Sequence, residues 1–237
     1  MPNPLTELKL ALDKCANPEK AAFYPRFFKT GKGEYGEGDR FIGVVVPDQR
    51  KVARQFRDLP LNQVARLFAS PYHEHRNTAL FILSLRYSRA KTDVERAEVY
   101  SFTLDHMGRI NNWDLVDCAG PKIVGVHMLS HPTETKNLYT WAGDRNLWTR
   151  RMSIMATFPF IREGHFDHTL EIAERLVADE HDLIHKAVGW MLREVGNRDR
   201  AVECGFLDIH ATTMPRTMLR YAIEKFPESM RKEYLQR

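Results

Sequence analysis

Apolar residues recur at intervals of three and four along most of the chain, the spacing that gathers them on one face of an α-helix. Leu5, Leu8 and Leu12 form the first such series, and another covers residues 64–68. Proline, asparagine and aspartate residues divide the pattern into segments of roughly 10 to 18 residues with short links. This pattern predicts an all-α protein.

One segment departs from the helical spacing. Residues 41–46 form the continuous apolar run FIGVVV, which follows a glycine-rich stretch and ends at Pro47, a residue favoured in the first turn of a helix. Because the run is short and stands alone, we interpret it as a connector between helices.

A weak internal repeat links four of the predicted helices. The segments HEHRNTALF, INNWDLVDC, LWTRRMSIM and LIHKAVGWM align on Arg76, Trp113, Arg150 and Lys186, with spacings of 37, 37 and 36 residues. Periods of this size are typical of helical-pair repeats, which stack to bury their apolar faces. The repeat predicts a curved right-handed α-α superhelix, or solenoid, of HEAT-like repeats, forming a single domain over residues 1–237. Generic helix packing is the alternative explanation of the repeat.

Charge and cysteine content restrict the possible partners and compartments only in part. The net charge of +4 permits a polyanionic partner without requiring one. The three cysteines lie far apart, which argues against a disulfide framework or a thiolate metal site and fits a reducing cytoplasm.

No apolar run reaches the roughly 18 residues of a membrane span, and the N-terminus lacks a signal-peptide pattern. We therefore expect a cytoplasmic protein that is neither exported nor anchored.

Two tryptophans and one carboxylate occupy related positions in the repeat. Trp113 and Asp117 are four residues apart and share one helical face, and Asp117 aligns with Trp190 two repeats later. On its helical wheel, Trp190 lies between Lys186 and Arg193, opposite the apolar face. Equivalent positions in a solenoid line one surface, so these residues would face one groove that suits a cationic or aromatic guest. The alternative for Trp190 is packing against an adjacent repeat.

Other polar residues have simpler explanations. Asp114 lies in a first helical turn, where a carboxylate is stabilised by free amides and the helix dipole. Arg151 falls close to an apolar arc, so it should reach solvent or meet an anion, either a phosphate or a carboxylate in a structural ion pair. His73 and His75 stand at a helix entrance and are interpreted as surface or capping residues.

Cofactor motifs give no positive signal. His181 and His185 share the spacing of the zinc-protease helix but lack its glutamate and a third ligand, so we expect no metal. The chain also has no phosphate-binding loop, dinucleotide fingerprint or nucleophile elbow, so we expect no cofactor.

The segments NNWDLVDCAGPKIVG, NLWTRRMSIMATF and HKAVGWMLREVGN resemble those of the AlkD-like DNA alkylation repair enzymes, which are HEAT-like-repeat alkylpurine DNA glycosylases. The resemblance runs nearly end to end. It implies that Asp117 is the catalytic carboxylate and that Trp113 and Trp190 are the tryptophans at the lesion. The arginine of the family's N-x-W-x-x-R segment falls on Arg151. Phe27 stands where the family carries an aromatic hydroxyl, so any role of that hydroxyl is in doubt.

What the resemblance implies is hydrolysis of the N-glycosidic bond of N3- and N7-alkylated purines in double-stranded DNA, without metal or cofactor. A positively charged base leaves without a general acid, so Asp117 alone would stabilise the oxocarbenium-like sugar and orient water. Trp113 and Trp190 would offer ring faces to the cationic lesion, which need not be flipped out of the duplex. Backbone phosphates would be held by Arg151, Lys186 and Arg193.

The protein is expected to be a monomer. Two other functions stay open. A catalytically silent relative that recognises DNA structure would be expected to lack the tryptophans and Asp117. A HEAT-type protein-interaction scaffold would use Trp113 and Trp190 as interface anchors and the basic stripe for acidic partners.

Overall fold

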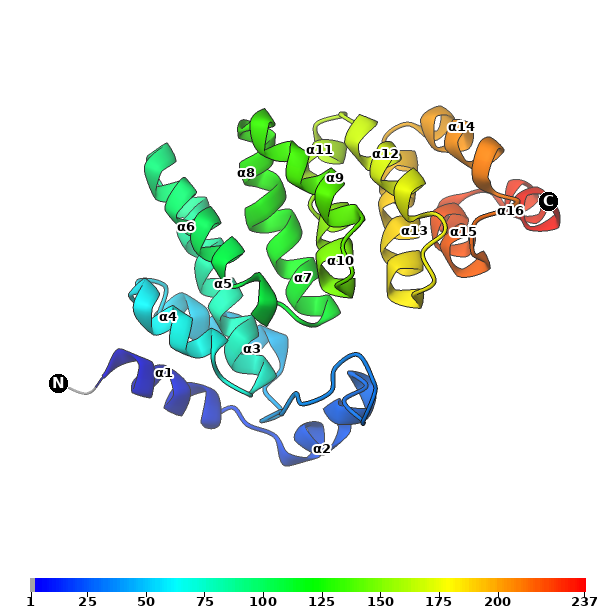
Figure 1. The fold of residues 1–237 in the computed structure, drawn as a ribbon. Helices are drawn as coiled ribbons and strands as arrows, with labels where there is room; N and C mark the ends of the chain where they lie inside the picture. Colours follow the sequence, from blue (N-terminus) through cyan, green and yellow to red (C-terminus); the bar gives the residue numbers. More distant parts are fainter. Residues whose placement is uncertain (1–2) are drawn as a thin grey trace. The chain divides into compact units, whose positions relative to one another are not determined.

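The computed structural model describes residues 3–237, and every regular element in that range is helical (Figure 1). An isolated β-bridge joins Arg40 to Tyr72. The prediction of an all-α protein is confirmed, and so is the connector, since residues 41–45 form no strand and lead directly into α3 (Val46–Gln55).

The chain divides into two compact units between Ala119 and Gly120. The division falls inside a continuous helical run, where α7 passes into the π-helical turn η2 (Gly120–Val124). The helices of the first unit are α1 (Pro4–Asp13), α2 (Pro18–Phe27), α3, α4 (Leu61–Phe68), α5 (His73–Arg89), α6 (Asp93–Asp105), η1 (Met107–Arg109) and α7 (Trp113–Ala119). After η2, those of the second unit are α8 (Gly125–Ser130), η3 (Pro132–Thr135), α9 (Lys136–Ala142), α10 (Leu147–Met155), α11 (Phe158–Arg162), α12 (Asp167–Leu176), α13 (Asp182–Gly196), α14 (Arg200–His210), α15 (Arg216–Ala222), η4 (Ile223–Lys225) and α16 (Glu228–Gln236).

The four segments aligned in the repeat all lie at or near the start of a helix, namely α5, α7, α10 and α13. In the first unit α5 packs against α7, and in the second α10 packs against α13, which in turn packs against α15. Gly189 permits the last of these contacts, because a Cβ added there would lie only 2.4 Å from the carbonyl oxygen of Met218. Helix-on-helix packing within each unit is thus established, and the superhelix stays a prediction.

Side chains at helix N-termini explain several of the element boundaries. Thr92 and Glu95 form a reciprocal capping box at the start of α6. Asn146 and Asp199 accept hydrogen bonds from the first free amides of α10 and α14. Of these helices, α10 carries the candidate residue Arg151.

Candidate functional site

Trp113 and Asp117 both lie on α7, one turn apart, as the sequence predicted. The side-chain oxygen of Asn112 accepts a hydrogen bond from the Trp113 amide at 2.8 Å and so starts the helix. Trp113 and Asp117 are partly exposed, whereas Leu115 and Val116 between them are buried. The helix therefore presents the aromatic ring and the carboxylate near its surface while anchoring its other face in the core.

Trp113 belongs to an aromatic cluster that the sequence analysis did not find. Its ring stacks on Phe28, with centroids 5.5 Å apart, and meets the edge of Phe27 at 5.9 Å. Phe28 stacks in turn on Phe41 of the connector at 5.1 Å. Phe27, noted in the sequence only for its missing hydroxyl, is half exposed beside Trp113. These contacts hold Trp113 against the end of α2, and Phe28 links it to the connector.

A cavity of about 270 Å³ opens beside this cluster, within the first unit. Gln49 and Asn77 are each 3% exposed, and their side-chain oxygens have no hydrogen-bond partner within residues 3–237. The Gln49 amide nitrogen donates to the Val44 carbonyl at 2.7 Å, which identifies the other amide atom as the acceptor. The cavity is lined by Tyr24, Phe27, Phe28, Phe41, Val44, Val46, Gln49, His73, Glu74, Asn77, Trp113 and Asp114.

A buried charge network lies next to the cavity. His73 is 2% exposed, with Nδ1 3.1 Å from Asp39 and Nε2 2.8 Å from Asp114. Arg76 donates to the other oxygen of Asp39 at 2.6 Å. Burial alone would lower the pKa of His73, but the charge of Asp114 and hydrogen bonds to Asp114 and Asp39 raise that pKa to about 9. His73 is therefore a buried imidazolium at neutral pH.

The interpretation of His73 and His75 as surface or capping residues is wrong, because both are buried. Two carboxylates compensate the burial of His73, and one of them, Asp39, comes from a loop far away in the sequence. The interpretation of Asp114 is confirmed in part: one of its oxygens accepts from the Leu115 amide in the first turn of α7, while the other pairs with His73. The sequence signal that was available is the polar run HEHRN at the start of a helix that aligns with the repeat.

Glu74 holds the connector in place. Its carboxylate accepts hydrogen bonds from the amides of Gly43 at 2.8 Å and Ile42 at 3.1 Å. Burial raises the pKa of Glu74, although these amide bonds oppose the shift. Gly43 has a φ of +83°, and a Cβ added there would lie 2.0 Å from the carbonyl oxygen of Asn17, so the close approach of the connector to α2 requires glycine.

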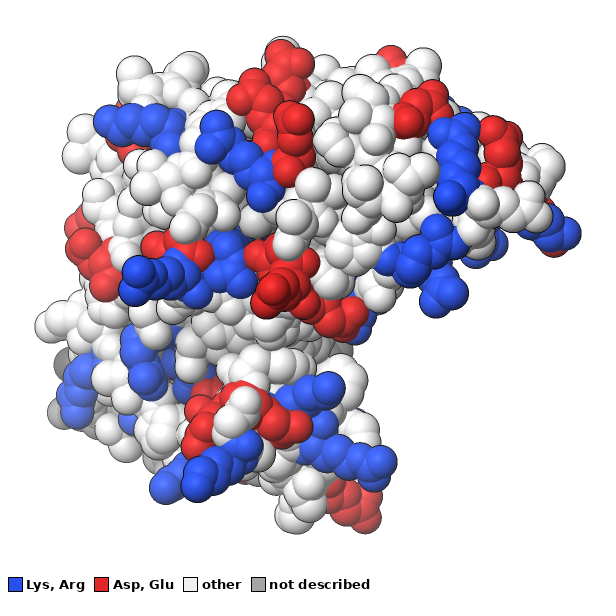
Figure 2. All heavy atoms as spheres, turned by 45° about the vertical axis from the view of Figure 1, so that its right-hand side comes forward, with Lys and Arg blue, Asp and Glu red and all other residues white. Residues whose placement is uncertain are grey.

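In the second unit, α13 has the two faces that the helical wheel predicted. Its apolar side is fully buried, and Lys186, Trp190 and Arg193 are partly exposed. Trp190 donates from its indole nitrogen to Glu194 at 3.0 Å. Lys186 pairs with Asp182 at 2.7 Å, and Arg193 pairs with Glu194 at 3.4 Å. Figure 2 likewise shows basic side chains beside acidic ones at several places on the surface.

Arg151 lies on α10 and is 4% exposed. Its guanidinium donates to the carbonyl oxygen of Leu183 on α13. The side chain falls near the apolar arc, as expected, but the expectation that it could reach solvent is wrong, because it is buried. Its hydrogen bond to Leu183 helps to hold α10 against α13. Its role with phosphate stays a prediction.

The structure brings the predicted site residues together in two groups. Trp113 and Asp117 share α7 in the first unit, and Lys186, Trp190 and Arg193 share α13 in the second. A single groove formed by both groups stays a prediction.

Residues 3–237 contain no group of three or more His, Cys, Asp or Glu side chains arranged to hold a metal ion. His181 caps α13 instead, accepting from the Leu183 amide at 3.1 Å. No helix in this range is long and apolar enough to cross a membrane.

Comparison with known proteins identifies the family. The family model of the DNA alkylation repair enzymes matches residues 8–226, nearly the whole chain. The chain belongs to the DNA alkylation repair enzyme family. Among solved structures, a protein described as a predicted DNA alkylation repair enzyme from Enterococcus faecalis has a similar fold, with a TM-score of 0.69 and 18% sequence identity. The match covers 90% of this chain and 97% of the other.

At that level of identity, the likeness to the Enterococcus faecalis protein establishes the fold alone. No curated protein sequence matches the chain. The resemblance to DNA alkylation repair enzymes is nevertheless confirmed by the family match.

Proposed function

We propose that this DNA alkylation repair enzyme is a glycosylase that hydrolyses the N-glycosidic bond of N3- and N7-alkylated purines in double-stranded DNA. The observation that carries the proposal is on α7, where the ring of Trp113 is held by Phe27 and Phe28 one turn before the partly exposed Asp117. An aromatic face beside a carboxylate suits a positively charged, planar base and the cation that forms when it leaves.

In the proposed reaction, the bond between the sugar C1′ and the base nitrogen breaks, and its electron pair goes to the base. The base thereby loses its positive charge, so no general acid is needed. The sugar becomes oxocarbenium-like, and the ionised carboxylate of Asp117 stabilises it. Asp117 also orients the water that attacks C1′ and takes up the proton this water releases.

The tryptophans and the cations of α13 have binding roles in this proposal. Trp113 and Trp190 contact the lesion nucleotide, each ring contributing about 1 to 2 kcal/mol where it is partly desolvated. Lys186 and Arg193 hold backbone phosphates, as does Arg151. The enzyme acts as a cytoplasmic monomer in base excision repair and needs no metal or cofactor.

The test is release of N7-methylguanine and N3-methyladenine from a methylated duplex under single-turnover conditions. Asp117→Asn should retain DNA binding and lose about 10²- to 10³-fold in rate, the typical loss when one electrostatic stabiliser is removed. Trp190→Ala should weaken binding to the lesion. Undiminished release by Asp117→Asn would contradict the mechanism.

The same experiment separates the alternatives. If the wild-type protein binds duplex DNA but releases no base, it is a non-catalytic reader of DNA structure. If it does not bind DNA at moderate salt, the protein-interaction scaffold becomes the better explanation, with Trp113 and Trp190 as anchors for a partner.

A further inference from the structure

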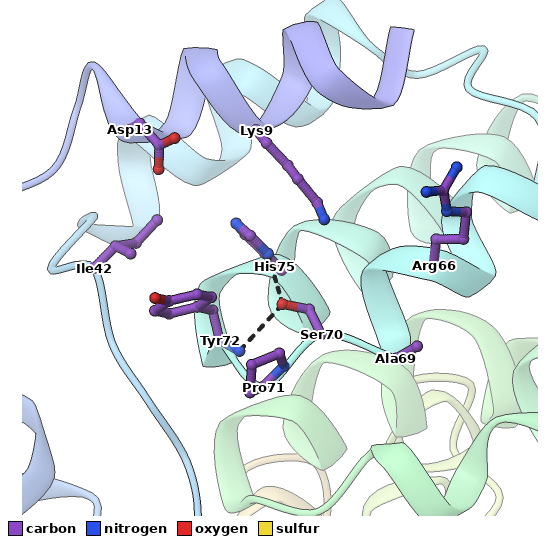
Figure 3. Close-up of a pocket in the computed structure, with 9 residues that line it drawn as sticks. All are labelled: Lys9, Asp13, Ile42, Arg66, Ala69, Ser70, Pro71, Tyr72 and His75. Carbon is purple, nitrogen blue, oxygen red and sulfur yellow. Dashed lines mark hydrogen bonds between the residues drawn. The ribbon is translucent and has the colours of Figure 1, made fainter. Parts of the chain in front are cut away.

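The structure has a second cavity, of about 560 Å³, between α1, the link from α4 to α5, and the start of α5 (Figure 3). The polar groups that line it do not converge on one ligand position. The Nε2 atom of His75 lies on the same side as Asp13, and the Arg66 guanidinium lies at the opposite end (Figure 3). A connected set of polar groups lies instead in the second unit, around Trp190 on α13.

Glu194 is the centre of this set. Its Oε1 accepts from the indole nitrogen of Trp190 at 3.0 Å and from the guanidinium of Arg193 at 3.4 Å. Its Oε2 accepts from the side-chain amide of Asn197 at 3.2 Å. A carboxylate held by three donors has little freedom to rotate, so its bond to Trp190 fixes the orientation of the indole ring.

Arg193 links Glu194 to a neighbouring segment of the chain. Its guanidinium also donates to Glu224 in η4, so one cation is shared by two carboxylates. Lys225, the other cation beside Glu224, is 4.0 Å away and mostly exposed, so its pairing contributes little. Arg193 therefore anchors the carboxylate of Glu194 and compensates its charge only in part.

An anionic acceptor at the indole N–H changes what the ring attracts. The face of a tryptophan attracts cations through the ring quadrupole, and a hydrogen bond from the indole to a carboxylate polarises the ring in the same sense. The carboxylate also attracts directly a cation that lies over the ring of Trp190. Neither effect acts on a neutral base of the same shape, so the bond from Trp190 to Glu194 favours charged guests over neutral ones.

We propose that Glu194 is a positioning residue that orients the indole of Trp190 and makes this ring select positively charged bases over neutral ones. The proposal rests on the proposed function, in which Trp190 contacts the lesion nucleotide. Glu194 acts through the tryptophan and does not itself touch the base. Because an N7-alkylated purine differs from the undamaged base by a positive charge and an added alkyl group, selection by charge distinguishes the lesion from normal purines.

The experiment compares two duplexes of one sequence. One carries a single N7-methylguanine, and the other carries its neutral 7-deaza analogue, in which carbon replaces the methylated nitrogen. A 2′-fluoro group on the sugar of each slows loss of the base, so that binding is measured instead of cleavage. Fluorescence anisotropy with the full chain gives the charge preference, which is the affinity for the cationic duplex divided by that for the neutral one.

Glu194→Gln keeps an oxygen acceptor for the indole and removes the negative charge. The charge preference should fall about tenfold, a value between the limits for one charge roughly 6 Å away in water and near a protein surface. Glu174→Gln is the matched control, since it makes the same change of net charge at an exposed residue of α12 outside this set. It should leave the charge preference unchanged.

Two further measurements show whether Glu194 acts through Trp190. In the Trp190→Ala background, Glu194→Gln should leave the charge preference unchanged, because the ring through which it acts is absent. In the free protein labelled with ¹⁵N at tryptophan, the indole N–H of Trp190 should exchange with solvent faster in Glu194→Ala than in wild type. Glu194→Gln should restore most of the protection, since its side-chain oxygen still accepts.

An unchanged charge preference in Glu194→Gln overturns the proposal, as does a wild-type protein that binds both duplexes equally. An equal fall in the presence and absence of Trp190 also overturns it, since Glu194 would then act without the tryptophan. Base release is measured separately with the unmodified methylated duplex. Release with no effect of Glu194→Gln refutes the role of Glu194 alone, and a lowered charge preference without release supports that role and refutes the glycosylase.

Discussion

His73 Nε2 lies 2.8 Å from a carboxylate oxygen of Asp114 and thereby ties the start of α5 to the start of α7. Asp114 directly follows Trp113 on α7, the helix that also carries Asp117. The ion pair therefore positions the segment on which the proposed chemistry depends, without itself contacting the reacting atoms.

Because of this ion pair, we expect the free energy of unfolding to fall as the pH becomes alkaline. The pKa of His73 is raised to about 9 in the folded protein, against 6.5 for an ordinary histidine. Its contribution is therefore fully present below about pH 6.5 and is lost as the pH rises through 9, a change of up to about 3 kcal/mol. Denaturant unfolding between pH 6 and 10 measures it, with His73→Gln as the reference. Parallel pH curves for the two proteins would refute the assignment.

Glu203 predicts a pH effect in the second unit. It is 1% exposed, one of its oxygens lacks a partner within residues 3–237, and burial raises its pKa to about 8. A carboxyl whose folded pKa is raised contributes most below its unfolded pKa near 4.5, and this contribution is lost as the pH rises through 8. Glu203→Gln should therefore match wild type near pH 4.5 and exceed its stability by a few kcal/mol at pH 8. Thermal unfolding at both pH values tests this, and equal melting temperatures at pH 8 would contradict it.

The features predictable from sequence were those set by local periodicity. The apolar arc of α13 and the shared face of Trp113 and Asp117 follow from the helical repeat, and both are found. Asp39 was not predicted because nothing in its glycine-rich loop indicates that it meets His73, 34 residues away. Long-range pairing of this kind depends on tertiary packing, which no local pattern encodes. Phe28 was missed for the same reason, since its contact with Trp113 joins segments distant in sequence.

Cations on α13 and α10 should differ in their effect on DNA binding. Lys186 is partly exposed, and its ion pair with Asp182 lies at the surface, where such a pair contributes little to stability. Lys186→Gln should lower the slope of log affinity against log salt by about 0.9, the value for one lost phosphate contact, and leave stability unchanged. Arg151→Ala should instead lower the melting temperature, because it removes the bond to Leu183. An unchanged salt slope for Lys186→Gln would exclude it from the DNA contact.

The amide oxygens of Gln49 and Asn77 have no hydrogen-bond partner within residues 3–237. We therefore expect that replacing such a group stabilises the protein but weakens binding of a base in the cavity. Both are buried beside the aromatic wall of the cavity, where a purine amino group could donate to them. Replacing an unsatisfied polar group by an apolar one of similar shape removes a penalty, so Asn77→Leu should stabilise the protein by about 1 kcal/mol. If the cavity takes an alkylated base, the same variant should weaken binding of free N3-methyladenine about tenfold.

Thr78 offers a matched control for this prediction. Its hydroxyl is also buried without a partner in the described residues, yet Thr78 does not line the cavity. Thr78→Val should therefore give a similar gain in melting temperature and leave binding of the base unchanged. Calorimetry of base binding and thermal unfolding, performed on both variants, separates the two effects. If Asn77→Leu binds the base as well as Thr78→Val does, the amide oxygen at position 77 has no part in recognition of the base.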